Sequence, residues 1–134
     1  MATYLLDTNI ISRVLRKEAE VSERLEDVLL GNETIILCPV VLYEIRRGLV
    51  KKVAVGIERA FEELISHFVW DEMVRQDWEK AAELWALSVR IGAPRNDADI
   101  LIASHAHRLG AVLVTDNESH FQHLGLETEN WCKP

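Results

Sequence analysis

The stretch from Asn96 to Phe121, "NDADILIASHAHRLGAVLVTDNESHF", predicts a buried helix that leads into a buried strand. Helical spacing runs from Asp97 to Leu109 and stops at Gly110, and the apolar run "AVLVT" then predicts a strand. A helix and strand of this kind favour an α/β fold, in which helices cover a mostly parallel sheet. The stretch also carries several acids, and we ask what they contact.

The two acids in "DAD" fall on different sides of this helix. Because successive residues turn by about 100°, Asp99 lies within the apolar arc, which predicts that it faces the sheet. Asp97 lies about 160° away, on the polar side with Ser104 and Arg108. Both acids suit the positive N-terminal end of the helix, with Asn96 as its cap. This explains Asp97 well, but an acid on the buried face is costly unless a charge or donors meet it.

The rest of the chain alternates between strands and helices. Apolar runs predict strands at 3–7, 34–39 and 68–70, and the short tail at 126–131 is a candidate for an edge strand. Helical spacing is found at 11–17, 21–32, 40–52, 56–68 and 74–92. In the last of these helices Trp78 and Trp85 are seven positions apart on one face, which predicts core packing. The pattern predicts a single domain, residues 1–134, in which helices flank the sheet.

Composition limits the class of protein. The chain has 134 residues, 49% apolar and 28% charged, as is typical of one soluble domain. No apolar run approaches the roughly 20 residues of a membrane span, and the N-terminus does not resemble a secretion signal, so we expect a cytoplasmic protein. Cys38 and Cys132 match no metal or disulfide pattern and are expected to be reduced thiols.

The net charge of the chain argues against binding nucleic acid through a general positive field. The net charge is −7, so the chain as a whole does not attract a polyanion. Basic residues gather locally around Arg13 to Lys17 and Arg46 to Lys52. Such clusters favour solvated helix faces over binding sites, although a local basic strip stays compatible with them.

Three further acids occupy positions where ligands bind in α/β proteins. Asp7 ends the first strand, and Asp116 follows the later strand "AVLVT"; carboxyl ends of strands are where such sheets bind ligands. Glu44 lies at the margin of a helix face that Ile45 and Leu49 bury. Each acid has a structural explanation of its own, such as an N-cap for Asp7 or a salt bridge for Glu44. Together with Asp99, however, they predict a shared cation.

Oxygen donors decide which cation is expected. Carboxylates with hydroxyl and amide oxygens around them suit Mg²⁺ or Mn²⁺ rather than zinc. The histidines predict no histidine metal site of any kind, because His105 and His107 point in different directions on their helix, while His120 and His123 lie in a loop-like segment.

In chain order, "YLLDTNIIS" (4–12), Glu44 in "LYEIRRG" (42–48), "DADILIASHA" (97–106), "LVTDNESHF" (113–121) and "LETENW" (126–131) resemble the motifs of PIN-domain proteins, specifically the VapC-type toxins of bacterial toxin–antitoxin pairs. The resemblance covers nearly the whole chain. It implies a three-layer PIN-like α/β fold and a metal-dependent endoribonuclease. Asp7, Glu44 and Asp99 match the catalytic, metal-binding triad.

The same resemblance implies roles around the triad. Thr8 and Asn9 match "DTN" and would orient Asp7. Thr115, Asp116 and Asn117 match the polar segment where many members place a fourth acid, and His120 holds the position of a later acid. Asp116, Asn117 and His120 therefore remain alternatives for completing the site. The resemblance also implies an RNA substrate, a small antitoxin partner and a homodimer.

Two other classes of protein also cluster acids. A receiver-like or phosphatase-like Mg²⁺-dependent phosphotransfer domain is disfavoured, because no second aspartate follows two residues after Asp7 and no lysine follows the "LVT" strand. A non-catalytic interaction domain, in which the acids bind a basic segment of a partner, stays open.

Overall fold

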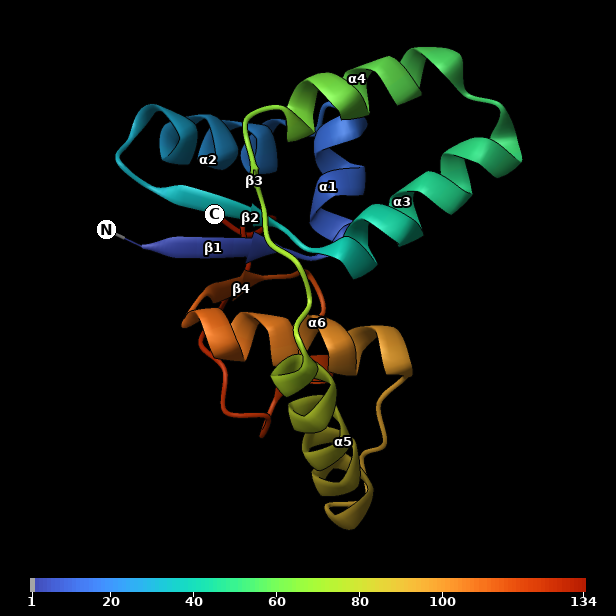
Figure 1. The fold of residues 1–134 in the computed structure, drawn as a ribbon. Coiled ribbons are helices and arrows are strands. Elements are labelled where there is room, and N and C mark those ends of the chain that lie inside the picture. Colours follow the sequence, from blue (N-terminus) through green and yellow to red (C-terminus); the bar gives the residue numbers. More distant parts are fainter. Residues whose placement is uncertain (1) are drawn as a thin grey trace.

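Five parallel strands form the sheet at the centre of the structure, a computed structural model that describes residues 2–134 (Figure 1). In space the strands follow the order β3-β2-β1-β4-β5, and every neighbouring pair is parallel. Their bounds are β1 Thr3–Leu6, β2 Thr34–Leu37, β3 Val69–Trp70, β4 Val112–Val114 and β5 Thr128–Glu129. The predicted parallel sheet is confirmed, and the tail does supply an edge strand.

Helices cover both faces of this sheet. They are α1 Thr8–Leu15, α2 Ala19–Leu30, α3 Pro39–Lys52, α4 Val55–Ile65, α5 Arg75–Arg90 and α6 Asp97–Leu109, with a short 3₁₀ helix, η1, at Glu118–Phe121. Figure 1 shows α1, α2 and α4 on one side of the sheet and α5 and α6 on the other. The α3–α4 hairpin extends beyond the sheet. The three-layer arrangement is thus as predicted.

The strand order reverses between β1 and β4. From β1 the chain moves outward to β2 and β3, whereas β4 and β5 lie on the opposite side. In the register of the β1–β4 pair, Leu6 lies opposite Val114, so the next residues, Asp7 and Thr115, leave the sheet side by side. In open α/β sheets such a reversal opens a crevice at the carboxyl edge, where ligands bind.

Helix α6 begins and ends where the sequence predicts, and it is buried on two sides. Ile102, Ala103 and Ala106 are fully buried, but so is Ser104, which the sequence had placed on a polar face. The reason is that α5 packs on the side of α6 that faces away from the sheet. Ser104 donates its hydroxyl to the carbonyl of Leu101 at 2.9 Å, which satisfies it inside the protein.

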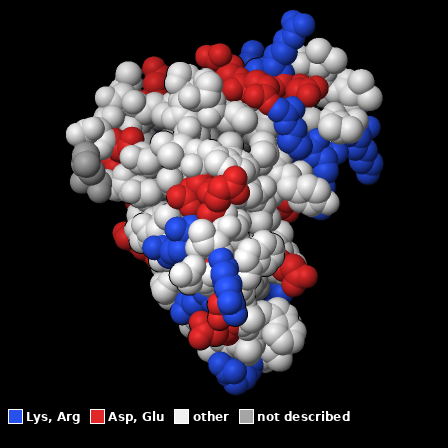
Figure 2. Space-filling view, viewed as in Figure 1, with Lys and Arg blue, Asp and Glu red and all other residues white. Residues whose placement is uncertain are grey.

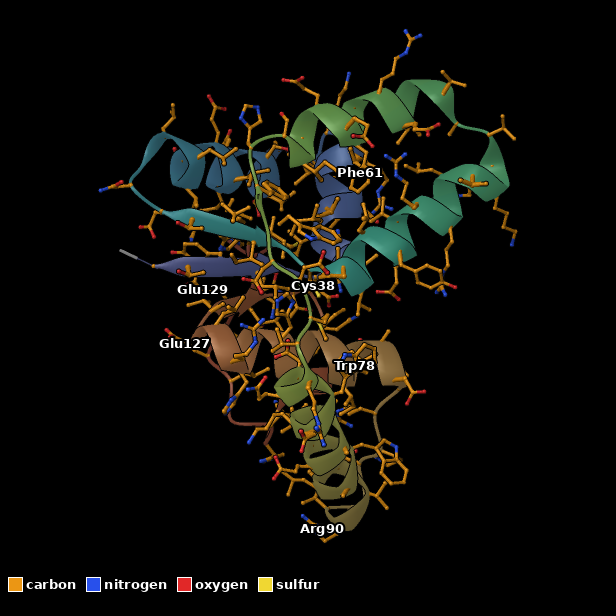
Figure 3. The ribbon with its side chains drawn as sticks, in the orientation of Figure 1. Cys38, Phe61, Trp78, Arg90, Glu127 and Glu129 are labelled. Atoms are coloured by element: carbon orange, nitrogen blue, oxygen red, sulfur yellow. The ribbon has the colours of Figure 1, made fainter. Side chains whose placement is uncertain are left out.

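The prediction that Trp78 and Trp85 pack in the core is wrong. Their side chains are 55% and 49% exposed. Helix α5 buries the neighbouring face, through Ala81, Leu84 and Ser88, so the tryptophans remain on its flank. Figure 3 shows Trp78 where α5 meets α6. Seven-residue spacing identified a shared face correctly but could not tell which face α6 covers.

The two cysteines differ in how deeply they are buried. Cys38 is buried at the junction of β2 and α3 (Figure 3), and burial raises the pKa of its thiol to about 11. Cys132 is half-buried, and both cysteines are free thiols.

Within residues 2–134, no helix combines the length and the apolar character that crossing a membrane requires.

Candidate active site

Asp7 and Thr115 meet at the carboxyl edge of the sheet, where the strand order reverses. The backbone N–H of Asp7 donates to the carbonyl of Val114 at 2.8 Å, which continues the strand pairing. The hydroxyl of Thr115 donates to Oδ2 of Asp7 at 2.8 Å, and both side chains are buried. Asn9 approaches the same carboxylate oxygen through Nδ2 at 3.3 Å. The sheet edge therefore fixes one carboxylate with partners from two elements.

Asp7 also caps helix α1, as its structural interpretation predicted. Its Oδ1 accepts the backbone N–H of Thr8, the first residue of the helix, at 2.7 Å. The cap holds the carboxylate at the start of the helix, where the positive end of the helix dipole favours it.

Glu44 joins Asp7 through Thr8. Helix α3 begins at Pro39, directly after β2, and buries Val41, Ile45 and Leu49. The Glu44 side chain lies at the edge of this buried face and is 19% exposed. Its Oε1 accepts the Thr8 hydroxyl at 2.7 Å. Its Oε2 lies 3.7 Å from Nη2 of Arg47.

Asp99 enters the site from the first turn of α6. The Asn96 side chain accepts the backbone N–H of Asp99 at 2.8 Å, which confirms the predicted cap. The Asp99 side chain is 16% exposed, whereas Asp97 is exposed, as their helix faces predicted. Oδ2 of Asp99 lies 3.1 Å from Nδ1 of His120, a residue of η1. Of the three alternatives left by the sequence, His120 thus contacts the triad directly.

Asp116 has different partners. Its Oδ2 accepts Nη2 of Arg13 at 2.5 Å, and its Oδ1 accepts Nδ2 of Asn130 at 3.1 Å. It is linked to the site through its backbone, whose N–H donates to Oδ1 of Asn9 at 3.1 Å. Asn117 likewise contributes its backbone N–H, to the Thr115 hydroxyl at 3.0 Å. A metal-binding role for Asp116 remains a prediction.

Burial is the main influence on the ionisation of Asp7. The pKa of Asp7 is raised from 3.8 to about 6, first by burial and to a smaller extent by the nearby charges of Asp99 and Glu44. Hydrogen bonds from Thr115 and from the backbone of Thr8 act in the opposite direction. Loss of water is thus a larger cause of the raised pKa of Asp7 than repulsion between like charges.

The donor set fits a hard divalent cation. Asp7, Glu44 and Asp99 offer carboxylate oxygens, and a cation near them would offset the cost of ionising the buried Asp7. Among residues 2–134, no three His, Cys, Asp or Glu side chains are grouped closely enough to hold an ion as they stand. A closed cage is not required, because Mg²⁺ commonly binds through one or two carboxylates and keeps several waters.

Several supporting residues were missed by sequence reasoning. Arg13 and Asn130 hold Asp116, and Arg95 holds the turn that carries His120. Arg13 and Asp116 are 103 positions apart, so no local pattern signals their contact. Nε2 of the buried His105 lies 2.9 Å from Asp71.

A cavity of about 310 Å³ lies beside the acids, between α1, α3 and α4. Thr8 and Glu44 form one end of it, and Arg16 and Lys52 line it as well. Its remaining walls are largely apolar and include Leu15, Ile45, Leu49 and Ile57. Members of the two basic sequence clusters are thus brought together beside the candidate site.

Basic and acidic side chains lie close together on the α3–α4 hairpin. Figure 2 shows Lys and Arg together with Asp and Glu at this end of the molecule. Arg46 accounts for part of the pattern, because it contacts Glu58 at 2.9 Å and also pairs with Glu62. Arg46 is therefore held by ion pairs within the hairpin, and Arg16, beside the site, contacts Glu18 at 3.2 Å.

Comparison with known proteins gives a consistent result. The model of the PIN domain family matches residues 4–126. The tRNA(fMet)-specific endonuclease VapC of Shigella flexneri is 32% identical, over 98% of this chain and 99% of its own length. Ribonuclease VapC1 of Haemophilus influenzae (strain R2866) is 28% identical, over 97% of this chain and 98% of its own length.

Solved structures show the same likeness. VapBC2 from Rickettsia felis, bound to a DNA fragment from its promoter, contains a chain that superposes with a TM-score of 0.88 at 28% identity, covering 96% of this chain and 98% of that one. DNA-bound VapBC from Salmonella typhimurium gives a TM-score of 0.86 at 27% identity, covering 98% of this chain and 100% of the other.

Proposed function

This chain belongs to the PIN domain family, and on that basis we propose that it is a metal-dependent endoribonuclease that acts as the toxin of a toxin–antitoxin pair. One observation carries the proposal: carboxylates from the end of β1, from α3 and from the start of α6 converge where the strand order reverses. The names of the VapC relatives support RNA as the substrate.

Each acid has a distinct role in the proposed reaction. Asp7 and Asp99 hold the divalent ion, and both are fixed by the start of a helix. Glu44 binds the ion or orients the attacking water, and the Thr8 hydroxyl keeps its Oε1 in place so that Oε2 can accept a proton. A bound Mg²⁺ or Mn²⁺ supplies the lowered pKa of water and the charge stabilisation that phosphodiester hydrolysis needs. Attack by water leaves a 5′-phosphate and a 3′-hydroxyl.

Basic side chains beside the site would position the RNA. The net charge of −7 and the three acids repel a phosphate backbone at long range. Arg16 and Lys52, which line the same cavity as Glu44, can contact phosphates that flank the cleaved bond. Binding should therefore weaken as salt rises, with a slope set by a small number of phosphate contacts.

The antitoxin would occupy the cavity between α1, α3 and α4. Its apolar walls suit buried side chains of a protein partner, and an inhibitor seated there would cover Thr8 and Glu44. The complexes named VapBC among the similar structures support such a partner. Growth arrest on expression, relieved by co-expressing the small protein encoded beside this gene, would support this part of the proposal.

A second copy of the chain would cover the exposed tryptophans. Trp78 and Trp85 border a cavity of about 340 Å³ that Ile100 and Leu101 also line. Projecting apolar side chains beside an apolar hollow make this face complementary to itself, as a twofold interface must be. We assign the proposed homodimer to this face of α5 and α6.

RNA cleavage by purified protein tests the proposed activity. The parent should cleave structured RNA when Mn²⁺ or Mg²⁺ is added and lose this activity with a chelator. Asp99→Asn should abolish nearly all cleavage, while Asp97→Asn should keep most of it, because only Asp99 faces the other acids. Equal loss in the two variants would contradict the assignment of faces, and cleavage unaffected by the chelator would contradict the metal dependence.

A further inference from the structure

His120 is held in place by an arginine from another part of the chain. Arg95, in the connection between α5 and α6, donates Nε to the carbonyl of His120 at 2.5 Å and Nη2 to the carbonyl of Ser119 at 3.0 Å. Its Nη1 donates to the carbonyl of Ala93 at 2.6 Å, which anchors the arginine itself. Arg95 therefore fixes the backbone of η1 beside α6. The imidazole of His120 is held next to Asp99 by these hydrogen bonds.

The imidazole and the Asp99 carboxylate are separated by a distance suited to chelation. Nδ1 of His120 lies 3.1 Å from Oδ2 of Asp99. Two donors at right angles around an ion with bonds of roughly 2.1 Å are about 3.0 Å apart. An ion could thus take both atoms as neighbouring ligands with little movement of either side chain. The His120 side chain is 51% exposed and the Asp99 side chain 16%, so the pair is open to solvent on one side.

We infer that His120 is a direct metal ligand, and that Asp99 and His120 together form a mixed nitrogen–oxygen site for a divalent transition-metal ion. The inference rests on the proposed function and makes it more specific. Mg²⁺ and Mn²⁺ both accept oxygen ligands, whereas an imidazole ligand favours transition metals such as Mn²⁺ over Mg²⁺. The site should therefore bind Mn²⁺ clearly more tightly than Mg²⁺.

Electron paramagnetic resonance of Mn²⁺ bound to the tag-free, full-length protein tests this directly. Electron spin-echo measurements should detect coupling to ¹⁴N in the parent. The coupling should disappear in His120→Asn and His120→Asp and persist in His123→Asn. His123 is a suitable control because it is exposed, lies three positions away and has a positive φ that asparagine tolerates.

Affinities for the two ions provide the second measurement. His120→Asn should lose Mn²⁺ affinity by roughly tenfold or more, since even removing a group that supports a metal ligand commonly costs that much. Mg²⁺ affinity, measured by competition, should change far less. His120→Asp should restore binding and narrow the gap between the two ions, because the replacement ligand is an oxygen.

The outcomes separate this inference from the proposed function. If the parent binds Mn²⁺ without ¹⁴N coupling, and Asp99→Asn does not bind Mn²⁺, the metal site stands but His120 is not a ligand. Coupling to ¹⁴N that survives in His120→Asn would also show that His120 is not a ligand. Mn²⁺ binding that is unchanged in Asp99→Asn would instead overturn the metal site of the proposed function.

Discussion

The hydroxyl of Thr8 donates a 2.7 Å hydrogen bond to Glu44, a residue 36 positions away on a different helix. The backbone N–H of Thr8 binds Asp7 at the same distance. One threonine therefore fixes two members of the proposed triad relative to each other. The sequence motif predicted that Thr8 orients Asp7 alone. Its contact with Glu44 gives Thr8 a second role, because Glu44 is the acid proposed to accept a proton.

Replacing Thr8 with valine should uncouple Glu44 while leaving the fold intact. The cleavage rate should fall roughly tenfold or more, because hydrogen bonds to charged groups are worth about 1.5–3 kcal/mol. Thr8→Ser keeps the hydroxyl and should retain most activity. Initial rates and thermal unfolding of both variants provide the check, and equal losses of activity in valine and serine would show that the hydroxyl is not what matters.

The raised pKa of Asp7 predicts an unusual dependence of stability on pH. The folded protein holds a proton on Asp7 up to about pH 6, whereas the unfolded chain releases it near the ordinary value of 3.8. Between these values the folded state binds more protons, so this contribution to stability is fully present below about pH 4 and is lost as pH rises through 6. The full effect is on the order of 3 kcal/mol.

Denaturant unfolding of metal-free protein between pH 4 and 7.5 would measure this effect. Asp7→Asn cannot ionise, so the difference in unfolding free energy between variant and parent should shift in favour of the variant as pH rises through this range. Titrating groups that do not interact with Asp7 are common to both proteins and cancel. Parallel pH curves for the two proteins would contradict the raised pKa.

Metal should stabilise the parent more than an Asp99→Asn variant. An ion at a hundred times its dissociation constant adds roughly 2.7 kcal/mol to a protein that binds it only when folded. The melting temperature of the parent should rise clearly with saturating Mn²⁺, and that of Asp99→Asn much less. Without metal the variant should be at least as stable as the parent, because it removes a charge near Asp7 and Glu44. A large loss of stability in metal-free Asp99→Asn, with an unchanged Mn²⁺ response, would make Asp99 a structural residue.

Polar replacement of the exposed tryptophans should weaken the proposed homodimer. Trp78→Gln combined with Trp85→Gln removes apolar surface from the face of α5 and should shift sedimentation toward the monomer at concentrations where the parent is dimeric. Leu30→Gln is the matched control, because Leu30 is 80% exposed on α2 and lies away from this face. A double variant that sediments like the parent would place the interface elsewhere.

The sequence by itself determined the elements and most of the proposed triad. Helix α6 begins at Asp97 and ends at Leu109 as predicted, because its cap, its periodicity and its terminal glycine are local signals. Asp7 and Thr115 were predicted at strand ends, and Asp99 on a buried face, for the same reason. These features depend on residues that are close together in the sequence, so local sequence patterns are enough to predict them.

Only the tertiary structure decided which distant groups meet. The contact of Arg13 with Asp116, the bond from Thr8 to Glu44 and the approach of His120 to Asp99 join residues 21 to 103 positions apart. Likewise the exposure of Trp78 depends on which flank of α5 packs against α6, a choice that seven-residue spacing leaves undetermined. Local patterns set the face on which a side chain lies, but packing between elements sets what that face touches.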